Sequence, residues 1–262
     1  MAPTAPMKLA VSGKGGVGKT TLTALLAVSM VDRGYRVTAI DADPNPTLAA
    51  ALGLPSQPIT PLLELREEIE QRIGGTGGLV RLNPQVDDLV DRVAVVHRGI
   101  RLVVAGAITR GGAGCACPQS VLLRRVIEFL ALERDQALLV DMEAGLEHLG
   151  RRSAHAADAL LVVVDPSRAS LETAVRIKRL AAEIGIGQVL GVANRVRGSA
   201  DEAYLAAHLD GLELIGAIPY SEALAEAERA GGQAAEVDAA ASGAVARLVD
   251  ALETRFKGRV RE

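Results

Sequence analysis

Residues 13–21 have the sequence GKGGVGKTT, in which glycine, lysine and threonine are spaced for phosphate chemistry. Glycines let a loop wrap an anion closely, so that its backbone N–H groups point at the oxygen atoms. Lys19 supplies a cation for the β- and γ-phosphates, and the Thr20 hydroxyl is a ligand for Mg²⁺. The pattern therefore predicts an ATP site that uses Mg²⁺. The predicted nucleotide-binding residues are Gly13, Lys14, Gly15, Gly16, Val17, Gly18, Lys19, Thr20 and Thr21.

Acidic side chains follow two of the apolar segments. Asp41 and Asp43 belong to DADPNP, and Asp141 belongs to LLVDMEAG. Ligands of open α/β sheets bind beyond the carboxyl ends of the strands, so we expect these residues beside the phosphate loop. An aspartate at a strand end is also a common turn former. The paired placement beside the phosphate loop favours a functional role for these strand ends over a turn-forming one.

The only two cysteines, Cys115 and Cys117, stand one residue apart in GGAGCACPQS. Two thiolates fall short of a structural zinc site, which takes about four ligands. In a two-fold dimer, however, the same loop would meet its copy and supply four thiolates. The alternative is an exposed pair without a role, against which the oxidation of exposed thiols argues. Planar S₄ coordination would favour Ni²⁺ and tetrahedral S₄ coordination Zn²⁺, so both metals stay open.

Short apolar segments that alternate with amphipathic ones must position these residues. Several of the short segments are continuously apolar, as in a parallel sheet covered on both faces. We expect a doubly wound α/β fold of the P-loop NTPase type, with a mostly parallel sheet flanked by helices. The predicted strands are Lys8–Gly13, Arg36–Asp43, Arg101–Ala107, Ala137–Glu143, Ala159–Pro166, Gln188–Val196 and Leu212–Pro219.

The chain of 262 residues is expected to form a single ATPase domain, with an insertion at about residues 56–100. Within that insertion ITPLLELREEIEQRI looks helical, whereas GGTGG and NPQVDD indicate loops. A last helix carries an apolar stripe, which predicts packing on the core in preference to a membrane surface. The stripe consists of Val245, Leu248, Val249, Leu252 and Phe256.

Composition narrows the classes of function. The net charge is −3 and only five aromatic residues are present (Tyr 3, Phe 2), which disfavours a nucleic-acid surface. The longest apolar run, ADALLVVV, is too short to cross a bilayer, and the N-terminal sequence lacks the pattern of a signal peptide. We therefore expect a cytoplasmic protein with reduced thiols that binds neither nucleic acid nor membrane.

The form KGGVGKTT, with a second lysine at position 14, resembles the deviant phosphate loop of the MinD/ParA/nitrogenase-iron-protein superclass of dimeric ATPases. The resemblance implies that Lys14 reaches the nucleotide of the partner subunit. It further implies that Asp43 orients or deprotonates the attacking water, which leaves a structural role for Asp41, while Asp141 holds Mg²⁺ and its waters. Gly145 would sense the γ-phosphate, and Asn194 in GVANRV would read the adenine edge. An asparagine at a strand end is also frequent as a plain turn residue.

From about residue 8 to residue 230 the chain is similar to the CooC-type ATPases, which assist nickel insertion into carbon monoxide dehydrogenase. The segments that carry this resemblance are GKGGVGKT, ITPLLELREEI, GCAC, DMEAGLEHLGR with His148, NRV and IPYSEAL. The family implies an ATP-promoted homodimer in which Cys115 and Cys117 of both protomers hold Ni²⁺ or Zn²⁺ for transfer to the dehydrogenase. The proline-rich DPNPTL at Asp43 departs from the expected sequence.

Three alternative functions are compatible with the same phosphate loop. A MinD/ParA-like positioning ATPase would need a basic surface or a membrane-targeting tail, and would leave the cysteines unexplained. An iron–sulfur electron carrier would need a cysteine soon after Asp141, and DMEAGLEHLGRRSAH contains none. A maturation ATPase for a related nickel enzyme would use nearly the same motifs, so the partner enzyme stays open.

Overall fold

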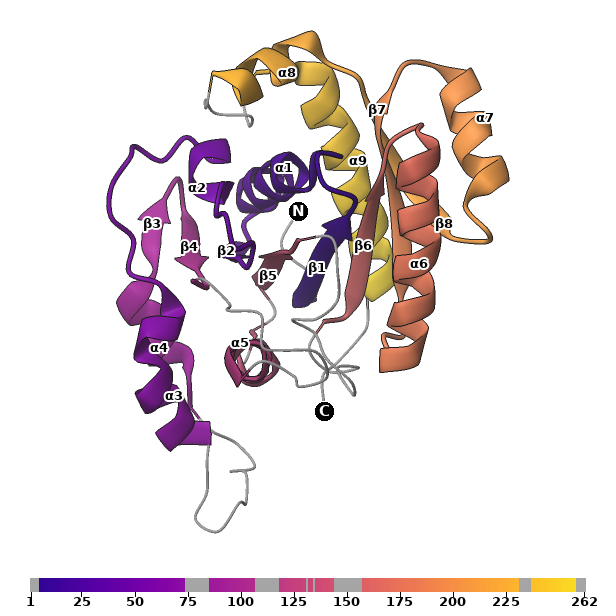
Figure 1. The fold of residues 1–262 in the computed structure, drawn as a ribbon. Coiled ribbons are helices and arrows are strands. Elements are labelled where there is room, and N and C mark those ends of the chain that lie inside the picture. Colours follow the sequence, from indigo (N-terminus) through magenta and orange to yellow (C-terminus); the bar gives the residue numbers. More distant parts are fainter. Residues whose placement is uncertain are drawn as a thin grey trace.

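The computed structural model describes residues 5–73, 85–106, 118–130, 132–133, 135–143, 157–230 and 237–257, with residues 118–120 described by their backbone alone. Within these ranges the strands form one eight-stranded sheet in the order β3-β4-β2-β5-β1-β6-β7-β8 (Figure 1). All neighbouring pairs are parallel except β3 and β4. The predicted mostly parallel, doubly wound α/β fold is confirmed.

Every predicted strand is present. Their bounds are β1 (Met7–Gly13), β2 (Arg36–Asp41), β4 (Ile100–Val104), β5 (Gln136–Asp141), β6 (Ala159–Val164), β7 (Val189–Val196) and β8 (Glu213–Pro219). Four predicted strands run two or three residues past the observed carboxyl ends. At β2 the cause is visible, because the Asp41 carboxylate accepts the N–H group of Asp43 and turns the chain out of the sheet.

The helices cover both faces of the sheet (Figure 1). Helices α1 (Lys19–Asp32), α2 (Leu48–Ala51) and α9 (Ala239–Phe256) pack on one face. The other face carries the 3₁₀ helix η1 (Leu62–Leu65), α3 (Arg66–Ile73), α4 (Asp87–Val93), α5 (Pro118–Phe129), α6 (Arg168–Ile184) and α7 (Ser199–His208). Helix α8 (Glu222–Arg229) follows β8 and buries none of its residues completely. Successive side chains of β1 alternate between the two faces: Leu9 and Val11 join one core cluster and Ala10 the other.

The last helix packs as its apolar stripe predicts. All five stripe residues of α9 are at most 1% exposed, and the helix lies against α1 and β8. Among the described residues, no helix combines the length and the apolar character needed to cross a bilayer.

The segment at 56–100 contains two elements that the sequence analysis missed. The predicted loop NPQVDD ends in the first turn of α4, where Asp87 and Asp88 suit the positive end of the helix dipole. The strand β3 (Val95–His97) pairs antiparallel with β4 through a two-residue turn at Arg98 and Gly99. Both turn residues have positive φ, 53° and 78°, as in the tight hairpin turns that suit sheet twist.

Candidate functional site

The phosphate loop joins the end of β1 at Gly13 to the start of α1 at Lys19. A β-carbon at Gly13 would lie 2.5 Å from the Val163 carbonyl oxygen, so glycine is required where the loop leaves the sheet. Gly16 and Gly18 have φ of 79° and 92°, which disfavours residues with side chains. No side chain caps the start of α1, so its first N–H groups face the loop and suit an anion.

The two loop lysines differ in placement. Lys19 is only 8% exposed, and its ammonium group donates a hydrogen bond of 3.3 Å to the Lys14 carbonyl, across the loop. The Lys14 side chain is partly exposed, and no hydrogen bond or ion pair of its ammonium group is found in the described part of the chain. The Lys19 ammonium group is thus bound within its own loop, whereas the Lys14 side chain is available to other groups.

Asp41 holds the turn that follows β2. Its carboxylate accepts the N–H group of Leu48 at 2.8 Å and that of Asp43 at 3.2 Å. Burial raises the pKa of Asp41 to about 6, although these hydrogen bonds oppose the shift. Both carboxylate oxygens are occupied by backbone groups, which supports the structural role expected for this residue.

Asp141 lies at the end of β5, directly opposite Asp41 in the parallel register. It is 1% exposed, and neither carboxylate oxygen has a hydrogen-bond partner of good geometry among the described residues. Burial raises the pKa of Asp141 to about 7 and the Asp41 carboxylate adds to the rise, whereas the Thr20 hydroxyl and the Lys19 ammonium group lower it. A buried, unpartnered carboxylate beside a hydroxyl and an ammonium group fits Mg²⁺ or its bound waters.

Asp43 lies in the turn between β2 and α2, on the same edge of the sheet. One of its carboxylate oxygens accepts the N–H group of Asn45 at 2.9 Å, and the residue is partly exposed. No ion pair involves its carboxylate in the described ranges. Asp43 is therefore held near Asp141 by the backbone and keeps an oxygen for water.

Asn194 braces the phosphate loop from the end of β7. Its side-chain Nδ2 donates to the Val17 carbonyl at 2.7 Å, and its Oδ1 accepts the N–H group of Arg195 at 2.9 Å. Asn194 is 9% exposed, and a β-carbon at Gly18 would lie 2.4 Å from its Nδ2. One N–H group and one lone pair of the amide are used within the protein, and the amide has a second of each, so its role at an adenine edge stays a prediction.

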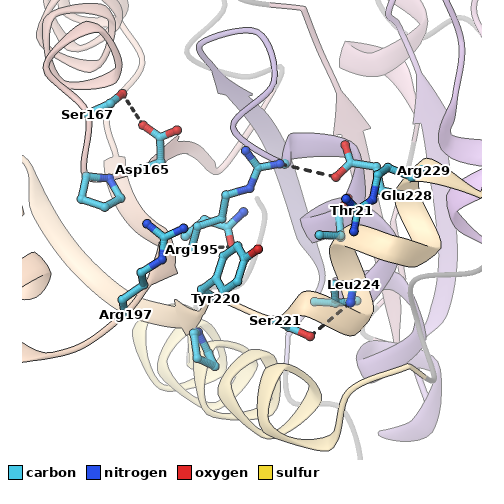
Figure 2. A pocket seen from close by; sticks show the side chains of 15 residues that line it. Thr21, Asp165, Ser167, Arg195, Arg197, Tyr220, Ser221, Leu224, Glu228 and Arg229 are labelled. Carbon is cyan, nitrogen blue, oxygen red and sulfur yellow. Dashed lines mark hydrogen bonds and ion pairs between the residues drawn. The ribbon is translucent and has the colours of Figure 1, made fainter.

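A cavity of about 730 Å³ adjoins the phosphate loop at the carboxyl ends of β6, β7 and β8, with α8 as its outer wall (Figure 2). Above the Tyr220 ring lies the Arg197 guanidinium group, 4.5 Å from the ring centre, and the Tyr220 hydroxyl donates to Glu222 at 2.6 Å. The lining residues are Gly18, Thr21, Asp165, Pro166, Ser167, Asn194, Arg195, Arg197, Pro219, Tyr220, Ser221, Leu224, Ala225, Glu228 and Arg229.

Four residues singled out in the sequence, Cys115, Cys117, Gly145 and His148, lie outside the described residues. The structure does describe the start of α5 at Pro118, directly after Cys117. It also describes how that helix is anchored at its far end. The buried Lys8 ammonium group donates to the carbonyls of Ile127 at 2.8 Å and Glu128 at 3.1 Å.

Comparison with known proteins identifies the family of this chain. Residues 8–233 match the family model of the CobQ/CobB/MinD/ParA nucleotide binding domain. The chain is also 39% identical over 231 residues to the carbon monoxide dehydrogenase accessory protein CooC of Rhodospirillum rubrum, covering 86% of this chain and 88% of that protein. This chain is a CooC-type member of the MinD/ParA nucleotide-binding family. Family membership makes it a nucleotide-binding ATPase.

Other relatives of this CooC-type chain span the same region. An uncharacterised ATP-binding protein of Methanocaldococcus jannaschii is 43% identical over 228 residues, covering 85% of this chain and 88% of that protein. The fold is also that of the septum site-determining protein MinD from Pyrococcus horikoshii, solved with Mg-ADP. That structure has a TM-score of 0.67 at 22% identity and covers 97% of this chain and 100% of its own.

In the CooC-type fold, parallel pairing brings the phosphate loop, Asp41, Asp43 and Asp141 to one edge of the sheet, as predicted. The cavity residues Arg195, Arg197 and Tyr220 were missed. Arg195 lies inside NRV, Arg197 directly after it and Tyr220 inside IPYSEAL. Nothing in either segment alone indicates that the ends of β7 and β8 form one wall.

Proposed function

We propose that this chain is a Mg²⁺-dependent metallochaperone ATPase of the cytoplasm. It forms a homodimer with ATP, carries Ni²⁺ or Zn²⁺ between the Cys115 and Cys117 thiolates of two protomers, and assists nickel insertion into carbon monoxide dehydrogenase or a related nickel enzyme. The observation that carries the proposal is the 39% identity to the accessory protein CooC over 86% of the chain.

The geometry of the phosphate loop supports the proposed mode of nucleotide binding. The loop N–H groups, the start of α1 and Lys19 hold the β- and γ-phosphates, and Thr20 and Asp141 bind Mg²⁺ directly or through its waters. When bound, Mg²⁺ neutralises charge on the phosphate oxygens. The buried carboxylate of Asp141 supports this role, because such a group needs a compensating cation.

In the proposed hydrolysis step, Asp43 and Lys14 have separate roles. Asp43 orients a water molecule whose oxygen attacks the γ-phosphorus, while the bond from that phosphorus to the bridging oxygen of ADP breaks. The water proton passes to Asp43 or to the released phosphate. Lys14 of the partner subunit supplies positive charge to the transition state. Turnover of the monomer is slow, since its site lacks that second lysine.

Metal carriage rests on the cysteine loop. Two loops, one from each protomer, provide the four thiolates of a closed site, and loosening of the dimer after hydrolysis leaves two weak half-sites. The metal is cargo, so its release to a partner enzyme is the useful step. Metal and ATP both favour the dimer, and by linkage each raises the affinity of the other.

The proposal is tested by reconstitution under anaerobic conditions. Nickel-free carbon monoxide dehydrogenase is incubated with limiting Ni²⁺, ATP and this protein, and carbon monoxide oxidation is followed. We expect activation that Lys19→Ala and Cys115→Ala both abolish. Equal activation by parent and variants, or none with the parent for this and related nickel enzymes, would contradict the proposal.

A further inference from the structure

Lys8 is a buried charged side chain that the proposed hydrolysis step does not use. It is the second residue of β1, at the opposite end of the strand from the phosphate loop, and it is 1% exposed. Along β1, Lys8 shares the face of Ala10, whose core cluster also contains side chains of α5. Moving an ammonium group out of water is costly, and an apolar side chain of similar size would fill the same space at less cost. Packing alone therefore does not account for the charge.

The Lys8 ammonium group caps the carboxyl end of α5. It donates hydrogen bonds to the carbonyl oxygen atoms of Ile127 at 2.8 Å and Glu128 at 3.1 Å. The last carbonyl groups of a helix have no partner within the helix, and the helix dipole makes that end negative. The last turn of α5 contains no basic residue of its own. A cation from a strand therefore caps this helix and ties its end to β1.

The backbone of Lys8 is also held on both sides. Its N–H group donates to an Asp158 carboxylate oxygen at 2.7 Å, and its carbonyl accepts the Asp158 N–H group at 2.7 Å. On the other side, Lys8 pairs in register with Leu138 of β5. The end of α5 is thus fixed to a central strand whose own position is set by both of its neighbours.

The two elements that Lys8 joins lead to two different sites. β1 ends at Gly13, where the phosphate loop begins, and α5 begins at Pro118, directly after Cys117. Hydrogen bonds to a charged donor are strong and directional, so this contact restrains both the position of α5 against β1 and its rotation about its own axis. In a two-fold dimer, the placement of the two phosphate loops would then also set where the two copies of α5 begin. One dimer geometry would suit both ATP and the shared metal.

We propose that Lys8 is a positioning residue that couples ATP binding to metal binding, because it holds α5 and β1 as one rigid unit. The inference rests on the proposed function, in which Cys115 and Cys117 of two protomers hold the metal. Without the Lys8 contact, the dimer with ATP still forms, but α5 shifts against β1 and the two pairs of cysteines meet less well. The affinity for each ligand then depends less on the other ligand.

The experiment measures the affinity for a non-hydrolysable ATP analogue with Mg²⁺ by anaerobic isothermal titration. Each protein is titrated once without metal and once loaded with one Zn²⁺ per two chains, and the ratio of the two affinities is the coupling. In the parent we expect Zn²⁺ to tighten binding of the analogue about tenfold or more. Metal content is measured again after each titration.

Lys8→Met replaces the lysine by an unbranched side chain of similar length without the charge. Its ratio should fall below about threefold, because α5 is no longer tied to β1. Its affinity for the analogue without metal should stay within about twofold of the parent, since Lys8 lies at the far end of β1 from the phosphate loop. Lys8→Gln keeps a hydrogen-bond donor without the charge and serves if Lys8→Met does not fold. The ratio for Lys8→Gln should lie between those of Lys8→Met and the parent.

Arg33→Met is the matched control. The Arg33 guanidinium group also donates to a helix carbonyl, that of Ala246 in α9 at 2.7 Å. Helix α9 covers the opposite face of the sheet from α5. The control therefore loses a contact of the same kind without touching α5, and it should keep the ratio of the parent.

Three results would overturn the role of Lys8. If Lys8 is merely structural, Lys8→Met melts at a lower temperature and keeps the parent's ratio. A ratio that falls equally in Arg33→Met would mean that any loosening of the fold is sufficient. Loss of Zn²⁺ from Lys8→Met before nucleotide is added would make Lys8 part of the metal site itself. A parent whose affinity for the analogue does not respond to bound Zn²⁺ would instead refute the shared metal site of the proposed function, and this inference with it.

Discussion

Asp41 and Asp141 are register partners at the ends of the adjacent strands β2 and β5, and both carboxyl groups are buried. Burial raises their pKa values to about 6 and about 7. Asp41 is satisfied by backbone N–H groups, whereas Asp141 is not. Without nucleotide, the charged form of Asp141 is therefore destabilised by burial, at the position where the proposed mechanism needs a ligand for a cation.

Asp141→Asn should change the pH dependence of stability. Because the pKa of Asp141 is raised from 3.8 to about 7, the folded protein retains a proton that the unfolded chain has lost. The free energy of unfolding therefore falls as pH rises from about 4 to about 7, and this loss levels off above pH 7, where the carboxyl group is ionised in both states. Without nucleotide and in EDTA, the variant should melt several degrees above the parent at pH 8, and the difference should shrink toward pH 5.5. Thermal unfolding followed by circular dichroism measures this; a difference independent of pH would contradict the assignment.

Lys14→Ala should separate nucleotide binding from dimerisation. The Lys14 ammonium group makes no hydrogen bond within its own loop, whereas that of Lys19 does. We expect the variant to bind ATP as a monomer and to remain one in sedimentation velocity with ATP. Lys19→Ala is the comparison and should lose ATP binding itself. ATP-induced dimers of Lys14→Ala at the parent's level would rule out the role across the interface.

Asp43→Ala should bind ATP and hydrolyse it poorly. Asp43 is held by the backbone near Asp141 without an ion pair in the described ranges. Removing its carboxylate should therefore leave the phosphate loop intact. Removing a residue that positions or deprotonates water typically costs about 10²- to 10⁴-fold in rate. Phosphate release gives the rate, and light scattering should show the variant accumulating as a dimer with ATP. Hydrolysis at the parent's rate would remove Asp43 from the mechanism.

Cys115→Ala and Cys117→Ala should each abolish tight metal binding while ATP binding stays nearly intact. We expect the parent to bind about one ion per dimer, because two protomers are needed for about four thiolate ligands. Affinity should fall at lower pH, since protons compete for the thiolates. Isothermal titration with Ni²⁺ and Zn²⁺ under anaerobic conditions tests both statements. One tightly bound ion per monomer that survives loss of either thiol would contradict the shared site.

The central strands could be predicted from the sequence because their side chains are buried on both faces. β6, for example, is buried along its whole length. The edge strand β3 could not, since it has three residues and its middle one, Val96, is 68% exposed. The turn at Arg98 and Gly99 was the one local signal for it. Strand ends were placed too late where side-chain contacts such as Asp41 to Asp43 turn the chain.

The phosphate loop and its acidic neighbours were predictable because their motif is contiguous and strand ends converge at one edge. The cavity wall was not, because it is assembled from β6, β7, β8 and α8 by packing. The two hydrogen bonds of the Asn194 side chain could not be predicted from the sequence either. They depend on a contact between residues 17 and 194, which no spacing in the sequence indicates.

The position of β1 in the sheet has a consequence for synthesis of the protein. The phosphate loop directly follows β1, but the strands that pair with β1 come much later in the chain: β5 at residues 136–141 and β6 at residues 159–164. In a nascent chain that ends before β5, β1 has neither of its neighbouring strands, and in one that ends before β6 it has only β5. Such a chain lacks the paired strands that shape the phosphate loop. Nucleotide capture therefore awaits emergence of more than half the polypeptide from the ribosome, and the loop's N–H groups stay hydrated until then.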